Sequence, residues 1–191
     1  MTLWIAVSFC GLAAMLKYER TAGEEGSPPG KARIPISGDA DSKKFHLVMF
    51  AHPRCPCTRA SLGELAILMT RCAGNVDSKV YFFVPRGAGD EWRETDNWRS
   101  AGAIPSVDTV ADEGGIQASR LGAKTSGVVF LYAPDGSLMF RGGITEGRGH
   151  SGDNPGRDAI IELIQTGHSS IDHAPVYGCS LIDSPLEGLP Q

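Results

Sequence analysis

The sequence predicts a three-layer α/β/α domain with a mixed central sheet, preceded by an N-terminal hydrophobic helix. Two observations predict this fold. Short apolar runs alternate with helical patterns over residues 45–167, and two late apolar runs flank a tight turn. Alternating strands and helices indicate parallel strands joined by crossover helices, whereas a tight turn joins antiparallel strands. The chain of 191 residues is long enough for one such domain with additions at both ends.

The first half of the domain supplies two strands and two helices. Residues 46–51 and 79–84 are apolar runs of strand length, which predicts two buried strands. Residues 58–73 predict a helix with one apolar face, because leucine, alanine and methionine recur at helical spacing. Cys72 falls on that face, so we expect it to be buried in the core. Residues 90–101 predict a polar helix.

The second half supplies the antiparallel part of the sheet. Residues 107–110 predict a short strand, and residues 115–121 predict a short helix. Residues 128–132 and 138–141 flank the sequence Ala-Pro-Asp-Gly, which is typical of a β-hairpin. A last helix is predicted to begin after Asn154, because a proline follows this capping residue directly.

The N-terminal apolar run covers residues 2–16. At 1.5 Å per residue it would extend roughly 22 Å, which is less than the roughly 30 Å hydrocarbon core of a membrane. Lys17 and Tyr18 could extend the run into the interface. We interpret residues 1–18 as an uncleaved signal-anchor helix that spans the membrane once. A cleaved signal peptide and a buried helix are the alternatives.

Two further segments lie outside the predicted domain. Residues 19–44 are rich in glycine, proline and glutamate and show no apolar period, which predicts a flexible linker. Residues 168–191 carry apolar side chains such as Val176 and Leu181, so we expect this C-terminal tail to pack back on the domain.

The composition excludes several classes of function. The formal net charge is −4 and the pI is about 5.7, which argues against nucleic-acid binding, because such modules present a basic stripe. Five cysteines are too few for a disulfide framework but enough for one redox or metal site. The sequence shows no arrangement typical of a serine hydrolase or a glycosidase.

The sequence Cys55-Pro-Cys57 stands between the first predicted strand and the first long helix. Free backbone N–H groups and the helix dipole stabilise a thiolate at such a helix start. Arg54, Arg59 and His52 are placed to add positive charge. A thiolate is the form that attacks a disulfide or binds a metal, so this motif is the predicted site.

These residues resemble the thioredoxin-like superfamily, in the redoxin branch that includes peroxiredoxin-like and membrane-tethered thiol–disulfide proteins. In that family a strand leads into a Cys-x-x-Cys motif that opens a helix. Residues 112–122 and 128–143 also resemble stretches of the family, and the likeness covers about residues 45–167.

A closer resemblance is to tethered bacterial proteins labelled RedB, which share four short motifs. Cys-Pro-Cys, Thr-Ser-Gly, Arg-Gly-His and Gly-Cys are matched by Cys55–Cys57, Thr125–Gly127, Arg148–His150 and Gly178–Cys179.

The resemblance implies a thiol–disulfide oxidoreductase with Cys55 and Cys57 as its catalytic residues and no cofactor. We expect Cys55, as the more accessible thiol, to be the nucleophile. Ser126 and Gly127 occupy the place of the family's cis-proline, so we expect them to face the cysteines through a trans peptide bond. Peroxidase activity is less expected, because the peroxiredoxin pattern is absent before Cys55.

The resemblance also implies partners and a location. We expect protein thiols or disulfides as partners, a membrane contact through residues 2–16, and no nucleic acid. The location implied is the bacterial inner membrane, with the soluble domain in the periplasm.

The alternative hypothesis is that the domain is a copper(I)-binding or metal-chaperone module. Soft thiolates suit copper(I), and the missing proline and the single-residue spacer favour a metal. Cys55, Cys57 and His150 would be the ligands, and Cys179 is a further candidate ligand. Cys179 is otherwise either a buried structural residue or a resolving thiol.

Overall fold

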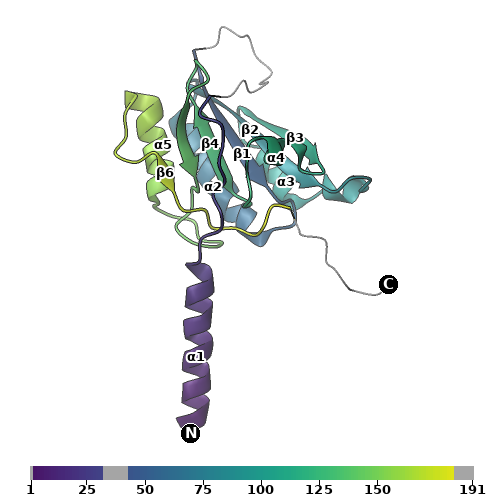
Figure 1. Ribbon diagram of the computed structural model, residues 1–191, viewed down its shortest axis with the longest axis vertical. Coiled ribbons are helices and arrows are strands. Elements are labelled where there is room, and N and C mark those ends of the chain that lie inside the picture. The colour runs from purple at the N-terminus through teal and green to yellow at the C-terminus, as the bar shows by residue number, and fades with distance from the viewer. Residues whose placement is uncertain (1, 32–42, 183–191) are drawn as a thin grey trace.

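A computed structural model describes residues 2–31 and 43–182 of the chain. Figure 1 shows a layered domain with one helix standing away from it. The elements in chain order are α1 (Thr2–Glu19), β1 (Phe45–Ala51), α2 (Pro56–Arg71), β2 (Val76–Val84), η1 (Asp90–Trp92), α3 (Asp96–Gly102), β3 (Val107–Glu113), α4 (Ile116–Arg120), β4 (Val128–Tyr132), β5 (Leu138–Gly142), α5 (Pro155–Thr166) and β6 (His173–Ala174).

The sheet is mixed, as predicted, and its strand order is β3-β2-β1-β4-β5-β6. Strands β1, β2 and β3 are parallel neighbours, whereas β4 runs antiparallel to both β1 and β5. This arrangement of a parallel β-α-β unit, an antiparallel hairpin and a final helix fits a thioredoxin-like fold, so the mixed sheet with flanking helices is confirmed. The tail adds β6, which pairs parallel to β5 and was not predicted as a strand.

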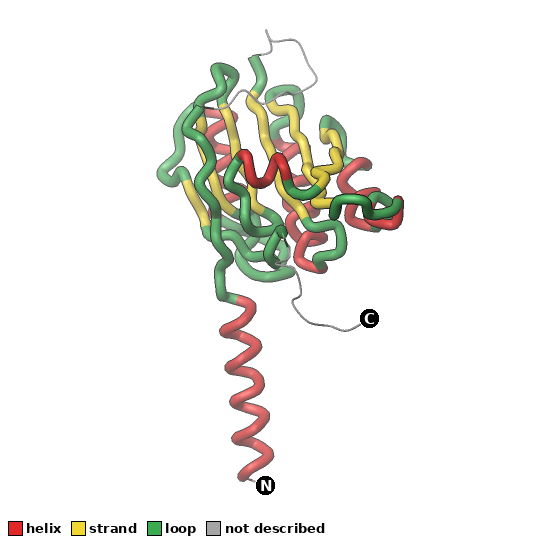
Figure 2. Tube along the Cα trace, turned by 45° about the vertical axis from the view of Figure 1, so that its right-hand side comes forward, coloured by secondary structure: helices red, strands yellow, loops and turns green. Residues whose placement is uncertain are grey.

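Two apolar clusters cover the two faces of the sheet, which is why its central strands are apolar throughout. Side chains from α2, α3 and α5 pack on one face, and Cys72 lies in this cluster, as predicted. On the other face the cluster includes side chains of α4 and of the tail, among them the fully buried Val176. Figure 2 shows α4 and extended loop segments lying across the sheet.

The predicted helix over residues 90–101 is interrupted. Asp90–Trp92 form one 3₁₀ turn, and α3 begins only at Asp96. The hydroxyl of Thr95 accepts a hydrogen bond from the Trp98 N–H at 3.3 Å, so Thr95 caps a new helix start inside the predicted one.

The N-terminal segment forms helix α1, whose apolar side chains such as Trp4 and Phe9 are exposed. Within the described residues, no helix combines the length and the apolar character needed to cross a membrane. The prediction of a membrane-spanning helix is therefore not supported.

The segments predicted as linker and tail run along the domain where they are described. Gly23 forms an isolated bridge with Val176, and Lys31 forms one with Ser137. The structure therefore places residues 20–31 of the predicted linker against the domain. The remainder of that linker up to residue 42, and the end of the predicted tail from residue 183, lie outside the described residues.

A buried ion pair ties α2 to α5, and its carboxylate also holds the loop that precedes α5. Arg157 Nη1 lies 2.6 Å from Glu64 Oε2, and the two side chains are 4% and 1% exposed. Glu64 also accepts a hydrogen bond from the Gly152 N–H at 2.8 Å. This pair fixes the loop that carries Arg148, a residue of the site described below.

We predict that Arg157→Met destabilises the protein by about 3–5 kcal/mol, because it leaves the Glu64 carboxylate buried without its partner. Glu64→Leu combined with Arg157→Met should recover part of that loss. Urea unfolding measures both values. The matched control is Lys124→Met, which breaks the exposed pair with Glu24 and should cost less than about 1 kcal/mol. A loss no larger for Arg157→Met than for the control would contradict the prediction.

Candidate active site

The Cys-Pro-Cys motif forms the start of α2, directly after β1. Cys55 is the N-cap residue and Pro56 occupies the first helical turn. The Cys55 N–H donates to the His52 carbonyl oxygen at 3.2 Å, and the Thr58 hydroxyl donates to the same oxygen at 3.1 Å. The motif therefore sits in a tight turn whose backbone is held by His52.

Three cysteines meet at this turn. The sulfur atoms of Cys55 and Cys179 lie 3.1 Å apart, within hydrogen-bonding distance. The sulfur of Cys57 joins them, so that all three lie within 4.8 Å of one another. Cys55 and Cys57 are thus close enough for redox chemistry, and Cys179 reaches them from the tail.

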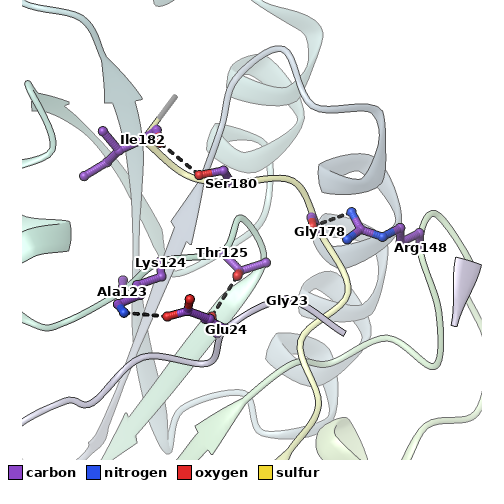
Figure 3. Close-up of a pocket in the computed structure, with 9 residues that line it drawn as sticks. All are labelled: Gly23, Glu24, Ala123, Lys124, Thr125, Arg148, Gly178, Ser180 and Ile182. Atoms are coloured by element: carbon purple, nitrogen blue, oxygen red, sulfur yellow. Dashed lines mark hydrogen bonds and ion pairs between the residues drawn. The ribbon is translucent and has the colours of Figure 1, made fainter. Parts of the chain in front are cut away.

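The tail is held at the site by its backbone. The Ser126 N–H donates to the Cys179 carbonyl oxygen at 2.9 Å, and the Leu181 N–H donates to the Lys124 carbonyl oxygen at 2.9 Å. A Cβ atom at Gly178 would come within 1.9 Å of the Ser126 oxygen, so only glycine allows this approach. Figure 3 shows Gly178 with Thr125 on one side and Arg148 on the other.

Arg148 completes the site and was not predicted as a functional residue. Its guanidinium donates to the Gly178 carbonyl oxygen next to Cys179 and lies 4.8 Å from the ring centre of Tyr18 at the end of α1. Its positive charge favours the thiolates of Cys57 and Cys179. The Arg-Gly-His motif match was the sequence signal that could have identified it.

The three thiols differ in acidity. Burial would raise the pKa of Cys55, but hydrogen bonds from the Cys179 thiol and from the backbone N–H groups of Cys179, Cys57 and Thr58 outweigh burial and lower it. Burial and the neighbouring Cys55 thiolate raise the pKa of Cys179 to about 12, and the same two causes raise the pKa of Cys57. Cys55 is therefore the thiol of the cluster that ionises most readily, and a hydrogen bond from the Cys179 thiol favours its charged form.

The predicted order of accessibility is corrected by the structure. Cys55 is only 3% exposed, whereas Cys57 and Cys179 are partly buried. A cleft of about 460 Å³ is lined by Cys55, Pro56 and Arg59 together with residues 95–97 of α3 and its cap. The lowered pKa of Cys55, not its exposure, distinguishes it from the other two thiols.

Ser126 contacts the residues that flank the motif, and Gly127 lies against α2. The Ser126 hydroxyl accepts from the His52 N–H at 2.8 Å and lies 3.1 Å from the Thr58 hydroxyl. Gly127 has φ +92°, and a Cβ there would come 2.9 Å from the Ser61 hydroxyl. None of the described peptide bonds is cis, including the bond between Ser126 and Gly127.

The predicted supporting side chains shape the loop before the motif. The His52 ring packs against Phe83 and Trp92 at centroid distances of 5.9 and 5.6 Å, and the Arg54 guanidinium lies 4.1 Å above the Trp92 ring. Asn97, which was not predicted, donates to the carbonyl oxygens of Pro53 and Cys55 at 3.0 and 3.1 Å. These contacts fix the backbone of the motif from the side of α3.

His150 is not brought to the sulfur cluster. Its side chain is exposed, and its Nδ1 lies 2.9 Å from the carbonyl oxygen of Arg148. The group of described residues that could hold a metal consists of Cys55, Cys57 and Cys179. In the metal hypothesis, Cys179 therefore replaces His150 as the third candidate ligand.

Comparison with solved structures finds the same fold at low sequence identity. A hypothetical protein from Sinorhizobium meliloti 1021 matches with a TM-score of 0.61 and 17% identity, over 87% of this chain and 98% of that chain. An uncharacterized conserved protein from Geobacillus kaustophilus matches with a TM-score of 0.59 and 18% identity, over 87% and 94%. No family model and no curated protein matches this chain.

A pair of substitutions at Cys179 tests the origin of the Cys55 thiolate. Cys179→Ala removes the thiol that donates to Cys55, so we expect the pKa of Cys55 to rise. The alkylation rate at pH 7 should then fall about tenfold for each pKa unit gained. Cys179→Ser keeps a donor of similar size and should retain most of the rate.

The measurement is the rate of iodoacetamide labelling of Cys55 between pH 5 and 10, read by peptide mass spectrometry. The exposed Cys10 is replaced by serine in every variant, so that it does not compete for the reagent. Identical pH profiles for the alanine and serine variants would show that Cys179 does not stabilise the thiolate.

Proposed function

We propose that this chain is a thiol–disulfide oxidoreductase in which Cys55 attacks and Cys179 resolves. The observation that carries the proposal is the 3.1 Å contact between the two sulfur atoms, of which one belongs to a thiol of lowered pKa and the other to a thiol with a pKa of about 12. A thiolate next to a protonated thiol is the pairing that disulfide exchange requires, because only the thiolate attacks.

The reaction consists of two exchanges at sulfur. The Cys55 thiolate attacks one sulfur of a substrate disulfide, which forms a mixed disulfide and releases the other substrate sulfur as a thiolate that takes up a proton. Cys179 then loses its proton and attacks the Cys55 sulfur. This step forms the Cys55–Cys179 disulfide and releases the second substrate thiol. The substrate is reduced by two electrons and the cysteine pair is oxidised.

The change of charge at the site makes the second step possible. Once Cys55 is bound to substrate, its negative charge is gone, and the main charge that raises the pKa of Cys179 is removed with it. Arg148 remains beside Cys179 and favours its thiolate. The pKa of the resolving thiol therefore falls after the first attack, while burial, the largest cause of its raised pKa, remains.

Cys57 is a third thiol, and its sulfur lies within 4.8 Å of the sulfurs of Cys55 and Cys179. It can attack the Cys55–Cys179 disulfide and return one of the two sulfurs to the thiol form. The reductant that closes the cycle is a dithiol, and the reverse cycle oxidises such a dithiol. The partners proposed are accordingly proteins that carry thiols or disulfides.

We also propose that the chain is a RedB-like protein attached to a membrane. Apolar side chains exposed along α1, among them Trp4, Val7, Phe9 and Leu12, support a contact of α1 with a membrane surface, and the RedB-like resemblance implies the bacterial inner membrane. The thiol site would then work in the periplasm, an oxidising compartment in which disulfides persist.

The test uses half an equivalent of the aromatic disulfide DTNB, again with Cys10 replaced by serine. The reduced protein should release two coloured thiols per DTNB and keep no adduct, because a second cysteine resolves the first attack. Cys57→Ser combined with Cys179→Ser should release one coloured thiol and keep the other on Cys55. Cys55→Ser should slow the first release at pH 7 at least tenfold.

Insulin reduction by a dithiol, catalysed by the same variants, tests their relative activities on a protein disulfide. The Cys10→Ser protein is the control and should match the unaltered chain, since Cys10 lies on α1. Undiminished reaction of Cys55→Ser in both assays would overturn the proposal.

A further inference from the structure

We propose that reduced Cys55, Cys57 and Cys179 together bind one copper(I) ion as three thiolate ligands. The inference goes beyond disulfide exchange, because it assigns a ligand to the reduced cluster and not to the oxidised one. It rests on the positions of the three sulfur atoms, on the donor types around them and on the nearby positive charge.

The positions of the sulfur atoms match a three-coordinate metal. Metal–thiolate bonds of about 2.3 Å place three sulfurs in a plane roughly 4 Å apart around the ion. In the structure all three sulfurs lie within 4.8 Å of one another, and the Cys55–Cys179 pair is 3.1 Å apart. The Cys55–Cys179 pair must open by about 1 Å to reach this spacing, a change that a small side-chain rotation can supply.

The donor set selects the metal. Among the described residues, the ligand group around these sulfurs contains no histidine and no carboxylate. Zinc is almost always bound by four ligands in structural sites, and calcium and magnesium take oxygen ligands. Soft thiolates select copper(I) among the common ions, and three sulfurs without a fourth donor therefore fit copper(I) best.

Positive charge around the cluster offsets the charge of the complex. Three thiolates and one copper(I) ion carry a net charge of −2. The Arg148 guanidinium is held beside Cys179 by its bond to Gly178, and its buried Nε has no hydrogen-bond partner among the described residues. The start of α2 adds the partial positive charge of a helix N-terminus at Cys55 and Cys57.

The metal and the disulfide exclude each other. A Cys55–Cys179 disulfide removes two of the three ligands, so only the fully reduced cluster can bind the ion. Binding releases the protons of the ligand thiols and leaves the oxidation state of sulfur and copper unchanged.

The test is an anaerobic titration of the reduced full chain with copper(I) held by the coloured chelator bicinchoninate. We expect one copper per chain, and an affinity at least 100-fold lower after Cys179→Ser. His150→Ala and Cys10→Ser are the matched controls and should bind as the unaltered chain does. X-ray absorption should show sulfur ligands alone.

Two results would overturn the inference. One is a Cys179→Ser protein that keeps the full affinity, and the other is a His150→Ala protein that loses it. The DTNB assay on metal-free protein runs in parallel and reports on disulfide exchange alone. Loss of copper binding with intact exchange therefore rejects the metal site only, whereas intact binding without exchange rejects the proposed enzyme.

Discussion

The site depends on one interaction, the backbone pairing between the tail and the segment before β4. Hydrogen bonds at Ser126 and Lys124 hold residues 179 and 181 at the sheet, and β6 anchors the tail upstream of them. Without this pairing Cys179 would be a cysteine in a tail more than a hundred residues from the motif. With it, the Cys179 sulfur lies 3.1 Å from that of Cys55.

The chemistry follows from this contact. Burial alone would raise the pKa of every thiol in the cluster, because charge is disfavoured away from water. Donors at the start of α2 and the Cys179 thiol stabilise negative charge on Cys55, and that charge in turn opposes ionisation of Cys57 and Cys179. The cluster therefore favours a negative charge on Cys55 over one on Cys57 or Cys179. Removal of that charge in a mixed disulfide, or its neutralisation by a metal ion, releases the other two thiols for reaction.

The sequence was sufficient for the features that depend on local patterns. The apolar runs of β1 and β2, the capping residue Asn154 and the position of the motif at the start of α2 were all predicted, since each depends on neighbours in the chain. The break inside residues 90–101 was missed because Thr95 competes as a cap with the helical pattern around it.

Features set by contacts between distant segments could not be predicted in the same way. The low exposure of Cys55 depends on contacts with residues that are distant in the chain, such as Cys179. The role of Arg148 depends on the position of the loop before α5. Neither leaves a periodic pattern in the sequence. The tail was recognised as apolar, but its register, which decides where Cys179 lies, is determined by Gly178 fitting against Ser126.

The most direct measurement is a disulfide map of the oxidised chain. The protein is oxidised with one equivalent of diamide, its remaining thiols are alkylated, and its peptides are identified by mass spectrometry without reduction. The contact described here predicts a Cys55–Cys179 disulfide as the main product, with Cys57 alkylated. A Cys55–Cys57 disulfide with Cys179 alkylated throughout would contradict it and leave the tail cysteine without a part in the chemistry.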